Sequence, residues 1–169
     1  MIKADPKFQY CPHCGARLQP RNSDPRERNA CSTQGCGFVH WNNPVPVLAA
    51  VVEHEQHILL ANNHAWPADM FGLITGFLEP AETPEDGILR EVKEELGLIG
   101  EIVSLVGVYP FALMNQAIIT WHVRATGAIL LGEELRAFKH IEKQKLRPWE
   151  FGTGLAVRDW LRQQETATT

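Results

Sequence analysis

The chain has 169 residues, of which 44% are hydrophobic and 21% charged, and its formal net charge is −4. This length suits one well-packed domain with a small appendage, and the negative charge disfavours a dedicated nucleic-acid binder. No apolar run approaches the roughly 20 residues that cross a bilayer, and residues 1–10 lack the apolar core of a signal peptide. We therefore expect a cytoplasmic protein with no membrane partner.

The charge is unevenly distributed along the chain. Residues 1–41 contain six basic and three acidic side chains, a net of +3, which leaves −7 for the remainder. The character changes at Asn42-Asn43-Pro44, where apolar and β-branched residues begin. We predict a small domain over residues 1–41, a main domain over residues 42–165 and a disordered tail over residues 166–169.

All four cysteines lie in the predicted small domain. Cys11 and Cys14 form a C-x2-C pair, and after sixteen residues Cys31 and Cys36 form a C-x4-C pair. Two close pairs in a cytoplasmic chain favour a zinc site with four cysteine ligands, whereas two disulfides or four free thiols are the alternatives. The polar stretch Asn22–Asn29 between the pairs is interpreted as a loop. The sequence predicts a zinc ribbon with structural Zn²⁺.

The main domain alternates predicted strands and helices, which indicates an α/β sandwich with a mixed sheet. A polar turn at Glu53–Gln56 separates the first two strands. The predicted strands are Pro46–Val52, His57–Ala61, Gly72–Leu78, Ile102–Tyr109 and Gln116–Thr126, and the predicted helices are Pro84–Leu96 and about Gly154 to Gln164.

The predicted helix over Pro84–Leu96 has clear boundaries. Thr83 is a plausible N-cap with Pro at the first helical position, and Gly97 is a natural C-terminal stop. Apolar residues gather on one face, and Glu91, Glu94 and Glu95 gather on another. Three neighbouring carboxylates suit a hard cation such as Mg²⁺ or Mn²⁺, although a solvated acidic face is the simpler reading of three acids alone.

The wider spacing around this helix decides between those readings. Residues 76–98, GFLEPAETPEDGILREVKEELGL, match every fixed position of G-x5-E-x7-R-E-U-x-E-E-x-G-U, where U is aliphatic. This resembles the Nudix box, a loop–helix–loop that holds metal against a diphosphate. The resemblance implies that Glu91, Glu94 and Glu95 bind catalytic Mg²⁺ or Mn²⁺, together with the backbone at Gly76, and that Glu82 and Arg90 brace the loop against the helix.

Residues outside the box carry weaker expectations. Glu134 resembles a later metal-binding glutamate of NADH-pyrophosphatase-like Nudix enzymes, but adjacent Glu133 competes with it and an exposed turn acid is the alternative. Tyr109 and Phe111 are candidates for stacking on a purine, with core packing at a strand end as the alternative. The general base is not fixed by the motif, and Glu91 or Glu95 is our choice.

A zinc ribbon ahead of a Nudix domain resembles the NADH pyrophosphatase group. Two departures are visible: the sequence shows none of the domain that usually precedes the ribbon, and Val108–Gln116 keeps only the Pro-Phe core of the S-Q-P-W-P-F-P-x-S signature. The resemblance implies a pyrophosphohydrolase that splits a nucleoside diphosphate derivative such as NADH, ADP-ribose or FAD, with a small nucleotide as partner and a homodimer as a further expectation. The alternative is a catalytically silent nucleotide sensor whose ribbon contacts a protein or nucleic acid.

Overall fold

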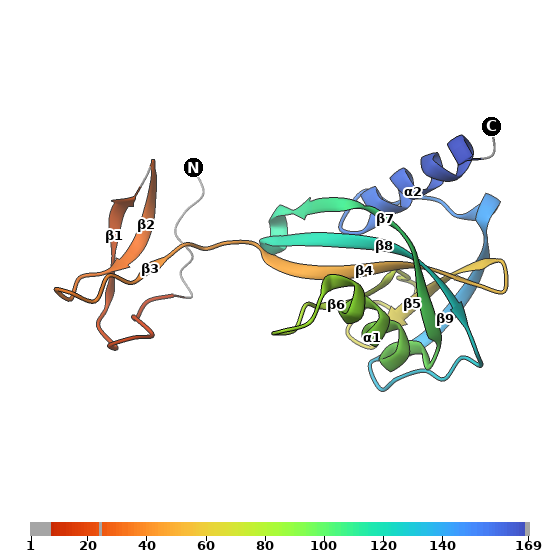
Figure 1. Cartoon of the computed structure of the whole chain (residues 1–169), viewed down its shortest axis with the longest axis horizontal. Helices are drawn as coiled ribbons and strands as arrows, with labels where there is room; N and C mark the ends of the chain where they lie inside the picture. The colour runs from red at the N-terminus through yellow and green to blue at the C-terminus, as the bar shows by residue number, and fades with distance from the viewer. Residues whose placement is uncertain (1–7, 24, 168–169) are drawn as a thin grey trace. The chain divides into compact units, whose positions relative to one another are not determined.

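The computed structural model describes residues 8–23 and 25–167 and divides the chain into two compact units (Figure 1). One unit comprises Met1–Asn43 and the other Pro44–Thr169. Each unit has its own sheet; the N-terminal unit has one buried cluster of side chains, and the larger unit has two, one on each face of its sheet.

The N-terminal unit is a three-stranded antiparallel sheet. Its strands are β1 (Leu18–Ser23), β2 (Arg26–Cys31) and β3 (Val39–His40), in the order β1-β2-β3. The stretch Asn22–Asn29, interpreted as a loop from its sequence, is instead largely paired in the β1–β2 hairpin. Its polar residues gave no strand signal because backbone pairing and the cysteine cluster, rather than an apolar face, hold these strands together.

The larger unit is built on a mixed sheet of six strands. They are β4 (Val45–His54), β5 (His57–Asn63), β6 (Ile74–Phe77), β7 (Ile99–Phe111), β8 (Gln116–Thr126) and β9 (Leu135–Glu142). The order is β7-β8-β4-β5-β9, and β6 pairs with the other half of β4. Strands β4 and β8 are parallel and the remaining pairs antiparallel. The predicted α/β fold with a mixed sheet is confirmed.

Two helices cover opposite faces of this sheet (Figure 1), α1 (Pro84–Leu96) and α2 (Gly154–Ala167). Strand β4 serves both faces because its side chains alternate. Leu48, Ala50 and Val52 pack with α1, whereas Val47, Ala49 and Val51 pack with α2. Short 3-10 turns, η1 (Ala112–Met114) and η2 (Lys143–Lys145), follow β7 and β9.

The elements of the larger unit agree closely with the sequence pattern. Helix α1 and strand β8 have the predicted bounds, while β4 and β7 extend beyond them at both ends. Strand β9 was not predicted, because most of its side chains are exposed and show no apolar alternation. Helix α2 continues to Ala167, so part of the expected tail is helical, and residues 168–169 lie outside the described part of the chain. Within residues 8–23 and 25–167, no helix combines the length and hydrophobicity needed to span a bilayer.

Candidate active site

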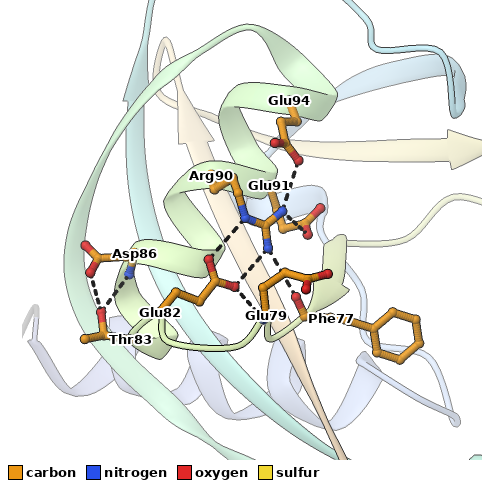
Figure 2. A network of polar contacts seen from close by, with 8 residues as sticks. All are labelled: Phe77, Glu79, Glu82, Thr83, Asp86, Arg90, Glu91 and Glu94. Carbon is orange, nitrogen blue, oxygen red and sulfur yellow. Dashed lines mark hydrogen bonds and ion pairs between the residues drawn. The ribbon is translucent and has the colours of Figure 1, made fainter.

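The site is organised by helix α1, whose ends are fixed by its sequence. The Thr83 hydroxyl accepts a hydrogen bond from the Asp86 backbone N–H at 3.1 Å (Figure 2), which stabilises the first turn by about 1 kcal/mol. Gly97 ends the helix with a φ of 68°, and its N–H donates to the Lys93 carbonyl. The apolar face, including Ile88 and Val92, is completely buried against the sheet. The acidic face is therefore held in a fixed orientation.

Arg90 is the centre of a polar network on this helix (Figure 2). Its Nε and Nη2 donate to the two carboxylate oxygens of Glu82, at 3.1 and 2.9 Å. Its Nη1 donates to Glu91 at 2.7 Å and to Glu94 at 3.0 Å, and Nη2 also reaches the Phe77 carbonyl at 3.2 Å. One guanidinium thus ties the loop after β6 to two carboxylates of the helix.

Glu82 completes this brace from the loop side. One of its carboxylate oxygens accepts the Glu79 backbone N–H at 2.7 Å as well as Arg90, and these bonds lower the pKa of the Glu82 carboxyl. A β-carbon on Gly87 would lie 2.6 Å from the same oxygen. Glycine inside the helix therefore makes room for the brace. The predicted Glu82–Arg90 pair is present in the structure.

Gly76, in strand β6, lies directly against Glu91. A β-carbon at this position would lie 1.9 Å from the Glu91 carboxyl carbon, so only glycine lets that side chain occupy its place. The Glu91 side chain is 13% exposed. The structure thus brings together two residues of the predicted metal site, separated by fifteen positions in the sequence.

A second segment brings Glu134 towards the same helix. The N–H groups of Leu130 and Gly132 donate to the carbonyls of Leu96 and Glu95, both at 2.9 Å. A β-carbon on Gly132 would lie 2.5 Å from the Glu94 carbonyl oxygen, so this approach also requires glycine. The negative charge of Glu134 acts on both Glu91 and Glu95.

Burial and neighbouring negative charges raise the pKa values of Glu91 and Glu95. Burial raises the pKa of Glu95 to about 8, and the charges of Glu91, Glu134 and Glu94 add to this effect. Burial also raises the pKa of Glu91, although Arg90 opposes the change. Among Glu91, Glu94 and Glu95, Glu94 is the exposed one, with 59% of its side chain accessible. The cluster accumulates negative potential that a cation would relieve.

The donor set fits a hard divalent cation. Carboxylate oxygens are the ligands that Mg²⁺ and Mn²⁺ prefer, and the raised pKa values of Glu91 and Glu95 show that both carboxyls ionise with difficulty when no cation is bound. Sequence reasoning named these residues, but it missed the supporting groups: the Phe77 carbonyl, the Glu79 N–H and the glycines at 87 and 132. Their roles depend on contacts between separate segments, for which the sequence carries no local signal.

The aromatic pair proposed for base stacking lies elsewhere. Tyr109 is 8% exposed and packs in the cluster under α2, on the sheet face opposite α1. Burial raises its pKa to about 12, and its hydroxyl donates to the Val106 carbonyl at 3.5 Å. Phe111 is partly buried against the same cluster. The geometry favours core packing, the alternative that the sequence left open for both residues.

The cysteines of the N-terminal unit converge on one point. The sulfur atoms of all four lie within 4.8 Å of one another, with Cys11 and Cys36 3.6 Å apart and Cys14 and Cys31 3.5 Å apart. A disulfide needs about 2 Å, whereas sulfurs at about 2.3 Å from a tetrahedral zinc ion lie about 3.8 Å apart. All four are free thiols, and the spacing fits zinc.

Hydrogen bonds reach two of the sulfurs and favour the charged form of Cys14, whereas the hydrogen bond with Cys11 and burial raise the pKa of Cys36 to about 12. The Thr33 N–H donates to Cys31 at 3.4 Å. A backbone hydrogen bond at Ala16 and the Thr33 hydroxyl lower the pKa of Cys14 to about 6. Gly15 and Gly37 supply the positive φ angles at which the chain turns around each cysteine pair. These features match the geometry of a ribbon knuckle.

The comparison with known families bears directly on this site. The model of the NUDIX domain matches residues 43–155, which include the whole of α1 and its bracing loops. The chain belongs to the NUDIX family. The family predicted from the sequence is therefore confirmed.

Curated relatives that are similar to the chain include NAD-capped RNA hydrolases. A NAD-capped RNA hydrolase from Vibrio vulnificus is 32% identical over 109 residues, which are 64% of this chain and 40% of the relative. A NAD-capped RNA hydrolase from Pseudomonas putida is 25% identical over 152 residues, 89% of this chain and 54% of the relative. The chain thus spans about half or less of the length of these curated relatives.

Solved structures agree with the NUDIX fold. A NUDIX hydrolase from Nitrosomonas europaea superposes with a TM-score of 0.77 and 25% identity, covering 93% of this chain and 90% of that one. An ADP-ribose pyrophosphatase from Streptococcus suis superposes with a TM-score of 0.60 at 20% identity, covering 72% and 92% of the two chains, and shows the shared fold alone. The first of these covers both units of the present chain.

Proposed function

We propose that this chain is a metal-dependent pyrophosphohydrolase that cleaves the diphosphate linkage of a nucleoside diphosphate derivative. The observation that carries the proposal is the Arg90 network, which holds Glu91 and Glu94 of helix α1 against the loop residue Glu82. Glu95, on the same helix, and Glu134 add further negative charge to this site. A protein that only bound nucleotides would have no need to keep so many repelling carboxyls together. NUDIX membership supports the same reaction class.

In the proposed reaction, water adds across the phosphoric anhydride. The water oxygen bonds to one phosphorus, the bond from that phosphorus to the bridging oxygen breaks, and the bridging oxygen leaves with the other phosphate. The products are a nucleoside monophosphate and the phosphorylated second group, and one water proton passes to a base. Glu91, Glu94, Glu95 and Glu134 would hold Mg²⁺ or Mn²⁺ together with the backbone at Gly76, and the bound cation would neutralise the diphosphate and acidify water.

The protein's own groups would orient and activate the reactants. Arg90 fixes the carboxylate of Glu91 while remaining bound to Glu82, so the loop and the helix move as one body. Glu91 or Glu95 would accept the water proton, and both are partly shielded from solvent. Shielding strengthens the electrostatic interactions on which phosphoryl transfer depends.

The relatives suggest which anhydrides to examine. Those from Vibrio vulnificus and Pseudomonas putida are named for NAD-capped RNA, and the Streptococcus suis structure is an ADP-ribose pyrophosphatase. We propose an adenosine diphosphate derivative as substrate, either as a free dinucleotide or at the 5′ end of an RNA. This extends to RNA the expectation of a small nucleotide partner.

The decisive experiment is a substrate panel with purified protein and Mg²⁺ or Mn²⁺. The panel contains NAD, NADH, ADP-ribose, FAD and an RNA oligonucleotide with a 5′ NAD cap, with products resolved chromatographically. Release of AMP with the matching phosphorylated fragment, or of 5′-monophosphate RNA, supports the proposal and names the substrate. If the metal is shown to bind and no anhydride is cleaved, the proposal is overturned and a sensor replaces it.

A further inference from the structure

Three histidines meet at the end of the large sheet, outside the carboxylate site. His54 is the last residue of β4 and His57 the first of β5, and they face each other across the β4–β5 turn. His140 lies on β9, where it pairs with Leu59 of the neighbouring strand β5. The rings of His54 and His140 are stacked with centroids 5.5 Å apart. No step of the proposed hydrolysis uses these side chains.

The separation of their nitrogens matches a shared cation. The Nδ1 atom of His54 lies 3.2 Å from the Nε2 atom of His140. Two imidazole nitrogens at about 2.0–2.1 Å from a tetrahedral metal ion lie about 3.3 Å apart. The carboxylate of Glu55, in the turn, completes a set of three ligand atoms that all lie within 4.8 Å of one another. Two imidazoles and one carboxylate form a known ligand set for transition metals.

A hydrogen bond to the backbone fixes the ring orientation and the protonated nitrogen of His54. Its Nε2 lies 2.9 Å from the Gly127 carbonyl oxygen, and a carbonyl only accepts hydrogen bonds, so Nε2 carries the proton. The lone pair therefore lies on Nδ1, the nitrogen that faces His140. Metal-binding histidines usually donate their second ring N–H to a backbone carbonyl or carboxylate in this way. Because His54 is 5% exposed, its ring is held in that orientation.

The turn keeps the third ligand in place. Glu55 and Gln56 both adopt positive φ angles, 48° and 65°, and the His57 Nδ1 donates to the Glu55 carbonyl at 2.8 Å. A buried His54 and the exposed His140 and Glu55 give the cluster one anchored ligand and two that solvent can reach. A cation therefore has a path of entry.

We propose that His54, Glu55 and His140 form a binding site for a divalent transition-metal ion such as Zn²⁺ or Ni²⁺. The imidazole ligands favour these ions over Mg²⁺, which prefers oxygen atoms alone. The site is separate from the cysteine cluster and from the carboxylates of α1, and it does not depend on the proposed hydrolase activity. A bound ion would join the β4–β5 turn to the edge strand β9.

The test counts metal ions on the full-length, tag-free protein. The chain is loaded with ribbon zinc and kept in excess Mg²⁺, which occupies the carboxylate site. Ni²⁺ is then titrated by calorimetry, and bound nickel and zinc are counted by mass spectrometry after gel filtration. The variants His140→Gln and Glu55→Gln remove exposed ligands without disturbing the core. His64→Gln removes an exposed histidine outside the cluster and is the matched control.

We expect one nickel ion per chain in addition to the zinc. Removing a ligand should weaken nickel binding at least about tenfold in His140→Gln and Glu55→Gln, while His64→Gln binds as the wild type does. The proposal is overturned if the wild type binds no additional nickel, or if both ligand variants bind it with unchanged affinity. The first result would show that His54 and His140 form only a hydrogen bond between their rings.

Discussion

The backbone of Gly76 lies directly against the carboxylate of Glu91. The β-carbon of any other residue at position 76 would lie 1.9 Å from the Glu91 carboxyl carbon, well inside van der Waals contact. The Arg90 Nη1 donates a hydrogen bond to the same carboxylate at 2.7 Å. The carboxylate is therefore confined between a strand backbone and a guanidinium, which fixes its direction without a rigid side chain.

The substitution Gly76→Ala should lower turnover much more than stability. The new methyl group would displace the flexible end of Glu91 rather than the backbone, and a displacement of about 1 Å at a catalytic group costs on the order of 100-fold. Steady-state kinetics on the substrate identified by the panel, with urea unfolding as the control, measures both quantities. Unchanged kcat in the variant would contradict the confinement of Glu91.

Glu95→Gln should separate activity from stability. Loss of one ligand charge should reduce kcat by about 100-fold or more. In protein free of Mg²⁺ and Mn²⁺, the same change should stabilise the fold, because it removes a carboxyl that is buried among Glu91, Glu134 and Glu94. Activity assays and urea unfolding on the same preparations test the two halves of this prediction.

The raised pKa of Glu95 also predicts how the stability of the fold changes with pH. Glu95 ionises near pH 8 in the folded chain but near 4.5 when unperturbed, so folding retains a proton that the unfolded chain releases. Wild-type stability without divalent cation should therefore fall as pH rises from about 4.5 to about 8. The Glu95→Gln variant should show a flatter profile across that window. Parallel profiles for the two proteins would refute the assigned ionisation.

Glu134 and Glu133 offer a matched comparison of adjacent acids. Of the two, Glu134 is the one that acts electrostatically on Glu91 and Glu95, and Asn63 donates a hydrogen bond to its carboxylate at 3.5 Å. We expect Glu134→Gln to raise the Mn²⁺ concentration that gives half-maximal activity by about tenfold, because a metal contact is lost. Glu133→Gln should leave that concentration unchanged. Equal effects of the two substitutions would remove Glu134 from the metal site.

Zinc removal should loosen the N-terminal unit alone. Metal binding supplies much of the folding free energy of small zinc units, and the buried cluster of this unit includes Cys11 and Cys31. Cys31→Ser, or chelation, should therefore expose residues 1–43 to proteolysis while residues 44–169 stay resistant. Mass spectrometry of a timed digest identifies the cleavage sites. Equal protection with and without zinc would argue against a folding role for the ion.

A partly buried ion pair joins β4 to the turn after β9, and its neighbour His122 packs against Trp160 of α2. Glu53 accepts hydrogen bonds from Lys143 at 2.7 Å and His122 at 3.0 Å. Burial alone would raise the pKa of Glu53, but these two partners outweigh it and lower the pKa. We expect Lys143→Met to cost about 1–2 kcal/mol at neutral pH, measured by urea unfolding.

The sign of the pH effect follows from that lowered pKa. The contribution of Glu53 is present above its ordinary pKa and is lost as pH falls through the lowered value in the folded chain, so the difference between Lys143→Met and wild type should shrink in acid. Lys145→Met is the control, because its pair with Glu142 is exposed. A Lys145 variant as unstable as the Lys143 variant would show that the loss is not specific to Glu53.

The sequence predicted the centre of the site because its signals are local. Thr83, Pro84 and Gly97 determine where α1 begins and ends, and the spacing of Glu91, Glu94 and Glu95 within one helix fixes their common face. Physical chemistry at short range suffices for such features. The same holds for the two cysteine pairs, whose members are close in the chain before it folds.

Features that depend on distant segments escaped the sequence. The exposed strand β9 has no apolar alternation, and the parallel pairing of β4 with β8 joins residues about seventy positions apart. Tyr109 shows the same limit: its sequence neighbours do not reveal which sheet face it occupies. Only the twist and register of the assembled sheet decide that its ring packs under α2.

The alternating side chains of strand β4 connect the two faces of the large sheet. Its small central residues, Ala49 and Ala50, are completely buried and belong to different clusters. At this point only the backbone of β4 separates the buried cluster under α1 from the buried cluster under α2. A larger side chain at Ala50 would crowd the cluster that includes α1, and one at Ala49 the cluster that includes α2. Natural variation at these two positions would thus tune the position of α1 and the anchoring of α2 independently.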